Sequence, residues 1–186
     1  GSVTHRDMMR LYLENGLLDN AEAVSFHDYN LPEKLEGKIR EYRDVFQGHS
    51  GSDLPLWITE CGRPWPVGTA RALPADDRFS AMCIAMKATE ARAGGVARFF
   101  PFVLPYYEES ANNFGMFDRF DTPMRSFAAY ANAVRQLAGK RYAGDLPGIE
   151  GVRLSRVFVG GDDPRARRIC GGVVACRRAL RPHNPL

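Results

Sequence analysis

Apolar residues occur along this chain in two patterns that alternate from one end to the other. Short runs that are apolar almost throughout cover residues 23–27, 54–60 and 96–104, and such runs are typical of strands buried on both faces. The stretches between them carry apolar residues three or four positions apart, which predicts amphipathic helices. These helices are predicted at residues 4–15, 32–47, 76–93 and 122–138.

The first and the last of these helices have stripes and ends that the sequence specifies. In the first helix, Met8, Leu11 and Tyr12 fall at helical spacing and define an apolar stripe. In the last helix, Thr122 is expected to cap the amino end and Pro123 to open the first turn. The inner face of that last helix is predicted to carry Phe127, Tyr130, Val134 and Leu137.

The order of elements predicts the fold class. Helices and strands alternate, with one helix between each pair of strands, which favours an α/β fold with a parallel sheet and right-handed crossovers. The longest loops, residues 61–75 and 105–121, follow the carboxyl ends of strands. Because parallel α/β folds place their sites at this end of the sheet, candidate chemistry is expected there.

The pattern changes after Gly148. "GVRLSRVFVGG" at 151–161 alternates like a strand, and "RICGGVVAC" at 168–176 predicts a second one. Residues 151–186 contain eight arginines and two aspartates, a net charge of +6, although the whole chain carries only +3. Such a tail can bind nucleic acid or an anionic surface, but a solvated, poorly ordered end is favoured. No aromatic residues interleave with the arginines, which weakens the case for binding a single strand.

Composition sets further bounds. The 186 residues suit one globular unit with a sizeable core, and 45% hydrophobic with 25% charged residues is ordinary for such a protein. No apolar run approaches the roughly 20 residues of a membrane helix, and residues 1–20 show helical spacing in place of a signal peptide. No tight metal-binding spacing joins the four cysteines, Cys61, Cys83, Cys170 and Cys176.

Polar side chains gather where the predicted strands end. In "WITE", the two-residue period places Ile58 and Glu60 on one face, so Glu60 is expected to emerge from the interior layer at the open mouth. The same period lets His27 and Tyr29 converge on that mouth, and it sends Cys61 to the opposite face. Further candidates for lining the cleft are Asn30, Arg63, Trp65, Tyr106, Tyr107 and Glu108.

Each candidate also has a structural interpretation. Glu60 is a strand-end carboxylate that Arg63 could neutralise, and His27 is a histidine whose hydrogen bonds a strand end could satisfy. Tyr29 and Trp65 are then packing aromatics of loops, Glu108 and Glu109 are loop charges, and the asparagines before Phe114 serve a turn. Together, however, carboxylates, a histidine and exposed aromatic rings suit a sugar, whose ring faces are apolar and whose edges carry hydroxyls.

These residues carry a family resemblance. "VSFHDYN", "LPLWITECGRPWP" and the stretch from "RFFPFVLPYYEES" through "NFG" and "TPMRSFAAYANAVRQL" resemble the last three strand regions of retaining glycoside hydrolases of the large TIM-barrel clan. The resemblance covers roughly residues 5–140. It implies the C-terminal part of a (β/α)8 barrel with about three βα units at residues 1–146. Residues 147–186 would form a β appendage or a basic tail.

The resemblance also implies residue roles. Glu60 stands at the position of the clan's nucleophile, in its "W-x-T-E-x-G" setting, and His27 and Tyr29 match the "His-x-Tyr" that ends the sixth strand. It implies a carbohydrate substrate, no cofactor and no metal, and no nucleic-acid or membrane partner. A parent enzyme of this class is expected to be secreted or periplasmic.

One departure from the clan pattern matters most. The clan's acid/base glutamate belongs to an Asn-Glu pair, and no such pair occurs in the chain. A retaining mechanism needs two carboxyl groups about 5–5.5 Å apart. Three strands also cannot close a barrel of eight, so both sheet edges should be open and one face should expose Ile58, Phe26 or Ser25, and Phe102. The chain is therefore expected to require an N-terminal barrel half and to be inactive alone.

Two other functions remain open at this stage. The first is a non-catalytic carbohydrate-binding or degenerate barrel protein that keeps the aromatic cleft without turnover. The second is a different barrel enzyme, such as a lyase or isomerase, that uses Glu60 as a base. The absence of a glycine-rich phosphate loop from the sequence disfavours phosphate-handling versions of that enzyme.

Overall fold

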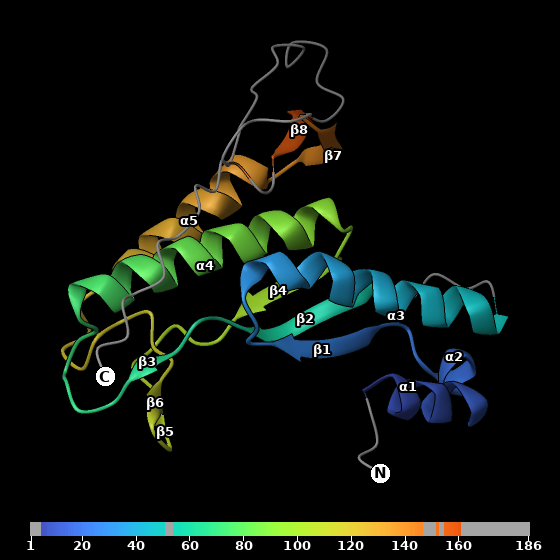
Figure 1. Cartoon of the computed structure of the whole chain (residues 1–186), viewed down its shortest axis with the longest axis horizontal. Coiled ribbons are helices and arrows are strands. Elements are labelled where there is room, and N and C mark those ends of the chain that lie inside the picture. The colour runs from blue at the N-terminus through green and yellow to red at the C-terminus, as the bar shows by residue number, and fades with distance from the viewer. Residues whose placement is uncertain (1–4, 51–53, 147–151, 153–154, 161–186) are drawn as a thin grey trace.

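A parallel sheet of three strands forms the centre of the protein (Figure 1). The computed structural model describes residues 5–50, 54–146, 152 and 155–160. The strands are β1 (Val24–Asp28), β2 (Leu56–Cys61) and β4 (Arg98–Pro101), in the order β1-β2-β4. The prediction of a mixed α/β fold with parallel strands in these three regions is confirmed.

The described residues also form helices. They are α1 (His5–Glu14), α2 (Leu17–Asn20), the short 3-10 turn η1 (Pro32–Lys34), α3 (Leu35–Ser50), α4 (Pro74–Ala93) and α5 (Arg125–Leu137). In Figure 1, α3, α4 and α5 lie on the same side of the strands. The main core forms beneath them because apolar side chains of α1 and α3 meet those of β1 and β2, including Leu13, Phe26, Leu35, Phe46, Leu56 and Ile58.

The face of β2 that carries Glu60 differs from the prediction. Ile58 is fully buried in the core under the helices, so a regular strand would have buried Glu60 there too. The register shifts between Phe26 and His27: Phe26 pairs with Ile58, but His27 pairs with Glu60. Thr59 is thus an extra residue, a bulge that turns Glu60 to the opposite face.

The face opposite the helices carries the polar and aromatic side chains. Ser25 and His27 are exposed on β1, where they alternate with buried neighbours. Trp57 and Phe100 are 37% and 47% exposed and their rings lie 6.5 Å apart. Of the residues expected on the open face, Ser25 is exposed there, whereas Phe26 and Ile58 belong to the core because the helices cover their side of the sheet.

Two smaller sheets flank the central one. The first joins β3 (Trp65–Pro66), β6 (Asn112–Asn113) and β5 (Glu108–Glu109) from the two long loops, all antiparallel. The second is a hairpin of β7 (Lys140–Asp145) and β8 (Arg156–Gly160). β8 confirms part of the strand predicted at 151–161, whereas the strand predicted at 168–176 lies outside the described residues. The proposed domain boundary after residue 146 falls between the strands of this hairpin.

A buried arginine ties the hairpin to the helices. Arg156 of β8 is 5% exposed and donates to both carboxylate oxygens of Glu90 in α4, at 3.0 and 2.6 Å. It also donates to Glu36 of α3 at 2.9 Å and to Asp145 of β7 at 2.8 Å. These carboxylates raise the pKa of Arg156, which therefore stays charged. Three separate segments converge on one guanidinium.

Two predicted helix faces need correction. In α1, Met8, Leu11 and Tyr12 are exposed, because the helix packs against α3 through the neighbouring stripe of Met9 and Leu13. In α5, Val134 departs from the predicted face, because it is 49% exposed, whereas Tyr130 packs against Phe99 and Phe127 against Phe117, at ring-centre distances of 6.1 and 5.1 Å. The buried residues of this helix are Ser126 and Ala133, and α5 packs closely with α4. The N-cap residue of α5 is Met124, so Thr122, the predicted cap, lies before the helix and does not cap it.

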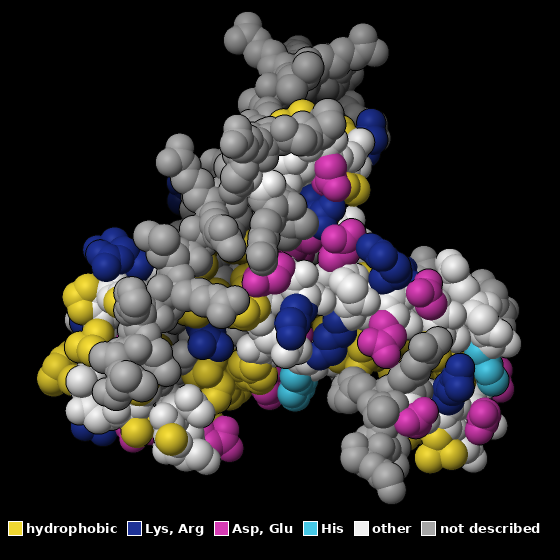
Figure 2. Space-filling view, viewed as in Figure 1, with side chains coloured by type: hydrophobic (Ala, Val, Ile, Leu, Met, Phe, Trp, Pro, Cys, Tyr) yellow, Lys and Arg dark blue, Asp and Glu magenta, His cyan; other side chains and the backbone are white. Residues whose placement is uncertain are grey.

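The surface shows a mixed charge pattern. In Figure 2, acidic and basic side chains alternate over α3, while hydrophobic side chains gather towards the lower left, over the loops near β3, β5 and β6. Within the described ranges, no helix combines the length and the apolar character that crossing a bilayer requires.

A glycine within α3 offers a stabilising substitution. Gly37 is exposed, and a Cβ built there meets no atom within 4 Å. Gly37→Ala is expected to raise the free energy of unfolding by about 0.5–1 kcal/mol, because alanine restricts the unfolded backbone and favours the helix. A urea melt followed by circular dichroism measures this. Gly94→Ala is the contrasting variant, since a Cβ there would lie 2.9 Å from Ile39 Cδ1; equal stabilisation by both would contradict the explanation.

Candidate active site around Glu60

Three polar residues meet at the carboxyl ends of β1 and β2. The Tyr29 hydroxyl donates to Glu60 Oε2 at 3.0 Å, and His27 Nδ1 lies 3.1 Å from the same oxygen. The side chain of Glu60 is 33% exposed and that of His27 is 54% exposed. No hydrogen bond from the described residues reaches Oε1, so one carboxylate oxygen is held and the other is available.

Tyr29 is suited to act as a hydrogen-bond donor. Its burial and its hydrogen bond to Glu60 raise the pKa of Tyr29 well above its ordinary value of 10.0. The phenol therefore stays protonated at any physiological pH and orients the carboxylate without competing for charge. The sequence predicted that Glu60, His27 and Tyr29 would converge, and the structure brings these three together.

Aromatic rings stand beside this group. Tyr29 makes edge contacts with Phe102 and Phe114, at ring-centre distances of 6.5 and 5.5 Å. Tyr107 lies 5.4 Å from Phe102 and is 40% exposed. These four residues, Tyr29, Phe102, Tyr107 and Phe114, are called the aromatic cluster below. Rings of this kind offer apolar surface beside Tyr29, the residue that holds Glu60 Oε2.

Tyr106, Glu108 and Trp65 form a separate group on the small sheet. The Tyr106 hydroxyl donates to Glu108 Oε2 at 2.7 Å, and Arg119 lies 3.7 Å from that oxygen and over the Tyr106 ring. Trp65 packs at 6.3 Å from Tyr106 but is only 2% exposed, and its indole donates to the Gly115 carbonyl. Trp65 therefore contributes to the packing of the small sheet, and its role as a sugar contact stays a prediction.

Arg63 and Asn30 point away from Glu60. The guanidinium of Arg63 lies 5.2 Å from the ring centre of Phe79 in α4, so Glu60 is not neutralised by Arg63. The amide of Asn30 donates to Asp28 at 3.1 Å. Their predicted contacts to substrate remain predictions, and neither residue touches the group at Glu60.

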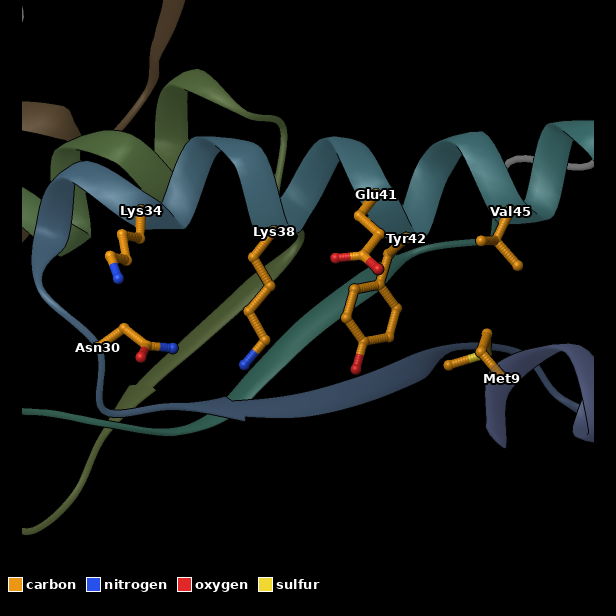
Figure 3. Close-up of a pocket in the computed structure, with 7 residues that line it drawn as sticks. All are labelled: Met9, Asn30, Lys34, Lys38, Glu41, Tyr42 and Val45. Atoms are coloured by element: carbon orange, nitrogen blue, oxygen red, sulfur yellow. The ribbon is translucent and has the colours of Figure 1, made fainter. Parts of the chain in front are cut away.

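The cavity near Asn30 is distinct from the group at Glu60. It has a volume of about 400 Å³ and lies between α3, α1 and the end of β1. Figure 3 shows Lys38 and Tyr42 of α3 and Lys34 at the end of η1 reaching towards β1, with Met9 of α1 opposite. Lys38 is held by the carbonyl of His27 and by Asp28, so the cavity adjoins the back of the strand that carries His27.

Cys61 lies on the other side of the sheet from Glu60, as the sequence predicted. It is fully buried in the core, and burial raises the pKa of the Cys61 thiol to about 12. Cys61 should therefore react with iodoacetamide at least about 100-fold more slowly in the folded chain than in guanidinium, because thiolate is the reactive form. Peptide mapping measures this rate. Equal rates in the two states would contradict the buried position and reopen a role for a thiol nucleophile.

The buried polar pair behind the site is one that sequence reasoning missed. Asp28 is 1% exposed and Lys87 is fully buried, and they form an ion pair at 3.0 Å. The available signal was a lysine next to Met86 within the amphipathic helix predicted at residues 76–93. In the described parts of the chain, no cluster of three or more His, Cys, Asp or Glu side chains is arranged to hold a metal ion.

Comparison with known proteins identifies structural neighbours. No protein-family model and no curated protein matches the chain. A glucosidase from Croceicoccus marinus has a TM-score of 0.64 at 14% identity, covering 86% of this chain and 34% of its own. A family 39 glycoside hydrolase from Bacteroides cellulosilyticus WH2 gives 0.58 at 18%, covering 82% and 34%. A GH39 enzyme from Xanthomonas axonopodis pv. citri gives 0.56 at 19%, covering 88% and 38%.

These likenesses define the fold. The mixed α/β structure resembles part of solved glycoside hydrolases, and it spans only 34–38% of the length of these three. The resemblance predicted from "WITECG" and its flanking strands is thereby confirmed at the level of the fold. The division into three βα units of an eight-stranded barrel stays a prediction.

Proposed function

We propose that this chain supplies the nucleophile region of a retaining glycoside hydrolase, with Glu60 as the nucleophile. The observation that carries the proposal is the geometry of Glu60. It stands at the carboxyl end of the central strand, with Oε2 held by Tyr29 and His27 and Oε1 available. The fold of glycoside hydrolases around it supports the same assignment.

The proposed reaction proceeds by double displacement. Glu60 Oε1 attacks the anomeric carbon while the bond to the leaving oxygen breaks, and water later hydrolyses the glycosyl ester. His27 and Tyr29 hold the other oxygen, which fixes the direction of attack. The aromatic cluster provides apolar ring faces for the sugar, with Tyr107 on the exposed side.

The leaving oxygen needs a proton from a second carboxyl group. Glu108 is engaged by Tyr106 and Arg119, and the chain has no Asn-Glu pair. We assign the acid to a residue outside these 186 positions, in an N-terminal barrel half that would pair with the open edges of the sheet at β1 and β4. Residues 1–146 would then be barrel and 147–186 an appendage.

A second candidate is a protein that binds carbohydrate without cleaving it. The observation in its favour is that the aromatic cluster is complete within this chain, whereas a catalytic acid is not. This candidate predicts sugar binding that survives removal of the Glu60 carboxylate and produces no covalent intermediate.

A mechanism-based label tests the proposal. In a 2-fluoroglycosyl fluoride, the fluoride leaves without a proton from a catalytic acid. The glycosyl group then accumulates as an ester of the nucleophile. The chain is incubated with gluco-, xylo-, galacto- and mannosyl forms, and peptides are mapped by mass spectrometry. An ester on Glu60 is expected. Saturable sugar binding with no ester would favour the second candidate, and neither binding nor ester would contradict both.

A further inference from the structure

A single lysine lies beneath the strand ends that carry the proposed site. Lys87 sits within α4 and its side chain is fully buried. Its Nζ lies 3.0 Å from Asp28 Oδ2 and donates to the carbonyls of Asp28 and Gly62, at 2.9 and 3.2 Å. The ammonium thus reaches two different strands, β1 through Asp28 and the end of β2 through Gly62.

The anchored residues are the direct neighbours of the reactive group. Asp28 lies between His27 and Tyr29 in the chain, and Gly62 follows Glu60 by two residues. The side chain of Asp28 points to the helices, while those of His27 and Tyr29 meet Glu60 on the other face. Lys87 therefore binds the backbone on the helix side of the sheet, where the segment with His27 and Tyr29 lies next to the segment with Glu60.

The third strand ends at the same point. The Phe102 amide donates to the Cys61 carbonyl at 2.8 Å, directly before Gly62. A Cβ on Gly62 would lie 2.9 Å from the Phe102 carbonyl oxygen, so only glycine lets the backbones approach this closely. Phe102 belongs to the aromatic cluster, so its position depends on the same junction.

Stability alone does not explain an ion pair at this depth. Removing an ammonium and a carboxylate from water costs several kcal/mol per ion, and apolar replacements of the same volume are often as stable. What a buried cation with three oxygen partners adds is fixed geometry, since one ammonium binds the Asp28 carboxylate and the carbonyls of Asp28 and Gly62 at two neighbouring strand ends.

We propose that Lys87 is a positioning residue that sets the distance between Glu60 and its partners His27 and Tyr29. It touches neither substrate nor the reacting atoms and acts through Asp28 and Gly62. The inference rests on the proposed function only in that Glu60 is the group being positioned. Its structural consequence, the alignment of Tyr29 with Glu60, is measurable without any catalytic turnover.

The test removes the lysine without leaving a buried charge. Lys87→Met alone leaves the buried Asp28 carboxylate with only the longer 3.5 Å ion pair to Lys38 and is expected to unfold the chain in part. The informative protein is therefore Lys87→Met with Asp28→Asn, which removes both charges. The matched control is Lys38→Met, because Lys38 also contacts Asp28 but binds only β1 residues, through the His27 carbonyl.

The readout is the titration of Tyr29 in the intact chain, labelled at the tyrosine ring carbons and assigned with Tyr29→Phe. The groups that act on this phenol are Glu60, Cys61 and Glu109. In the parent and in Lys38→Met, the Tyr29 signal should not move between about pH 8 and about pH 11. In the double variant this elevation of the pKa of Tyr29 should be reduced, so that the signal begins to titrate within that range, because the hydrogen bond to Glu60 weakens while burial of the ring, the larger cause, remains. Circular dichroism over the same range confirms that each protein stays folded.

A second readout separates this inference from the proposed function. The rate of 2-fluoroglycosyl labelling of Glu60 should fall roughly 10–100-fold in the double variant, because a shift of an ångström misaligns the nucleophile. If the parent forms no ester but the Tyr29 titration still shifts, the nucleophile assignment fails and the positioning role stands. A folded double variant with an unchanged Tyr29 titration overturns the positioning role, whether or not Glu60 is labelled.

Discussion

Arg156→Met should lower the free energy of unfolding by about 3–5 kcal/mol, because it leaves Glu90 as an unpaired buried carboxylate. Glu90 is 3% exposed and receives two hydrogen bonds from this guanidinium. For a chain of this length the loss corresponds to a fall of roughly 10 °C in melting temperature. A thermal melt followed by circular dichroism at neutral pH measures this loss.

Two further variants identify the cause. Arg156→Met combined with Glu90→Gln removes both charges and should recover most of the loss, since no buried ion remains. Arg141→Met changes an exposed arginine in the same hairpin and should stay within about 0.5 kcal/mol of the parent. If Arg156→Met melts within about 2 °C of the parent, the hairpin is not anchored through this pair.

The sequence predicted the central sheet because its strands are buried by helices and have near-continuous apolar runs. It did not predict the bulge at Thr59, because strand pairing with β1 determines the bulge and a single strand carries no sign of it. The sequence analysis therefore placed Glu60 on the same face of the strand as Ile58, whereas the bulge puts the two side chains on opposite faces. The short strands β5 and β6 were missed for a related reason: Glu and Asn have low strand propensity, and only tertiary pairing makes them strands.

In the candidate site too, the sequence predicted what depends on the strands themselves and missed what depends on tertiary pairing. His27, Tyr29 and Glu60 could be placed together from sequence because all three lie at the ends of adjacent parallel strands. Trp65 follows the same strand, but its burial depends on a sheet formed with Asn113, 48 residues later in the chain. Lys87 gave a weaker signal, because a lysine in an apolar helix stripe is read as a solvated end unless its acceptor is known.

The open sheet still holds a well-formed polar group at its strand ends. The helices cover one face of the sheet, and the core beneath them, together with the buried pair of Lys87 and Asp28, supports the strand ends. Trp57 and Phe100 remain exposed on the other face, which is the interior face if the barrel continues. The nucleophile would thus be formed by local packing, and the acid would come from the segment that closes the barrel.

Glu60→Gln should abolish the glycosyl ester, with the labelling rate falling by at least about 10³-fold. The amide keeps the size of the side chain and still accepts the hydrogen bond from Tyr29, but its oxygen is not a competent nucleophile. Tyr29→Phe should slow labelling only about 10-fold, since the carboxylate remains and loses one orienting donor. Peptide mapping over a time course measures both rates.

The matched control is Glu109→Gln, an exposed carboxylate on β5 of the neighbouring small sheet. In this variant Glu60 should be labelled at the same rate as in the parent, because Tyr29 and His27, which contact Glu60 Oε2, are unchanged. If Glu60→Gln is still esterified, the ester maps to another carboxylate and the nucleophile is not Glu60. If Glu109→Gln abolishes labelling while Glu60→Gln does not, the attacking group comes from the loop after β4, and the strand-end geometry of Glu60 serves only to bind the sugar.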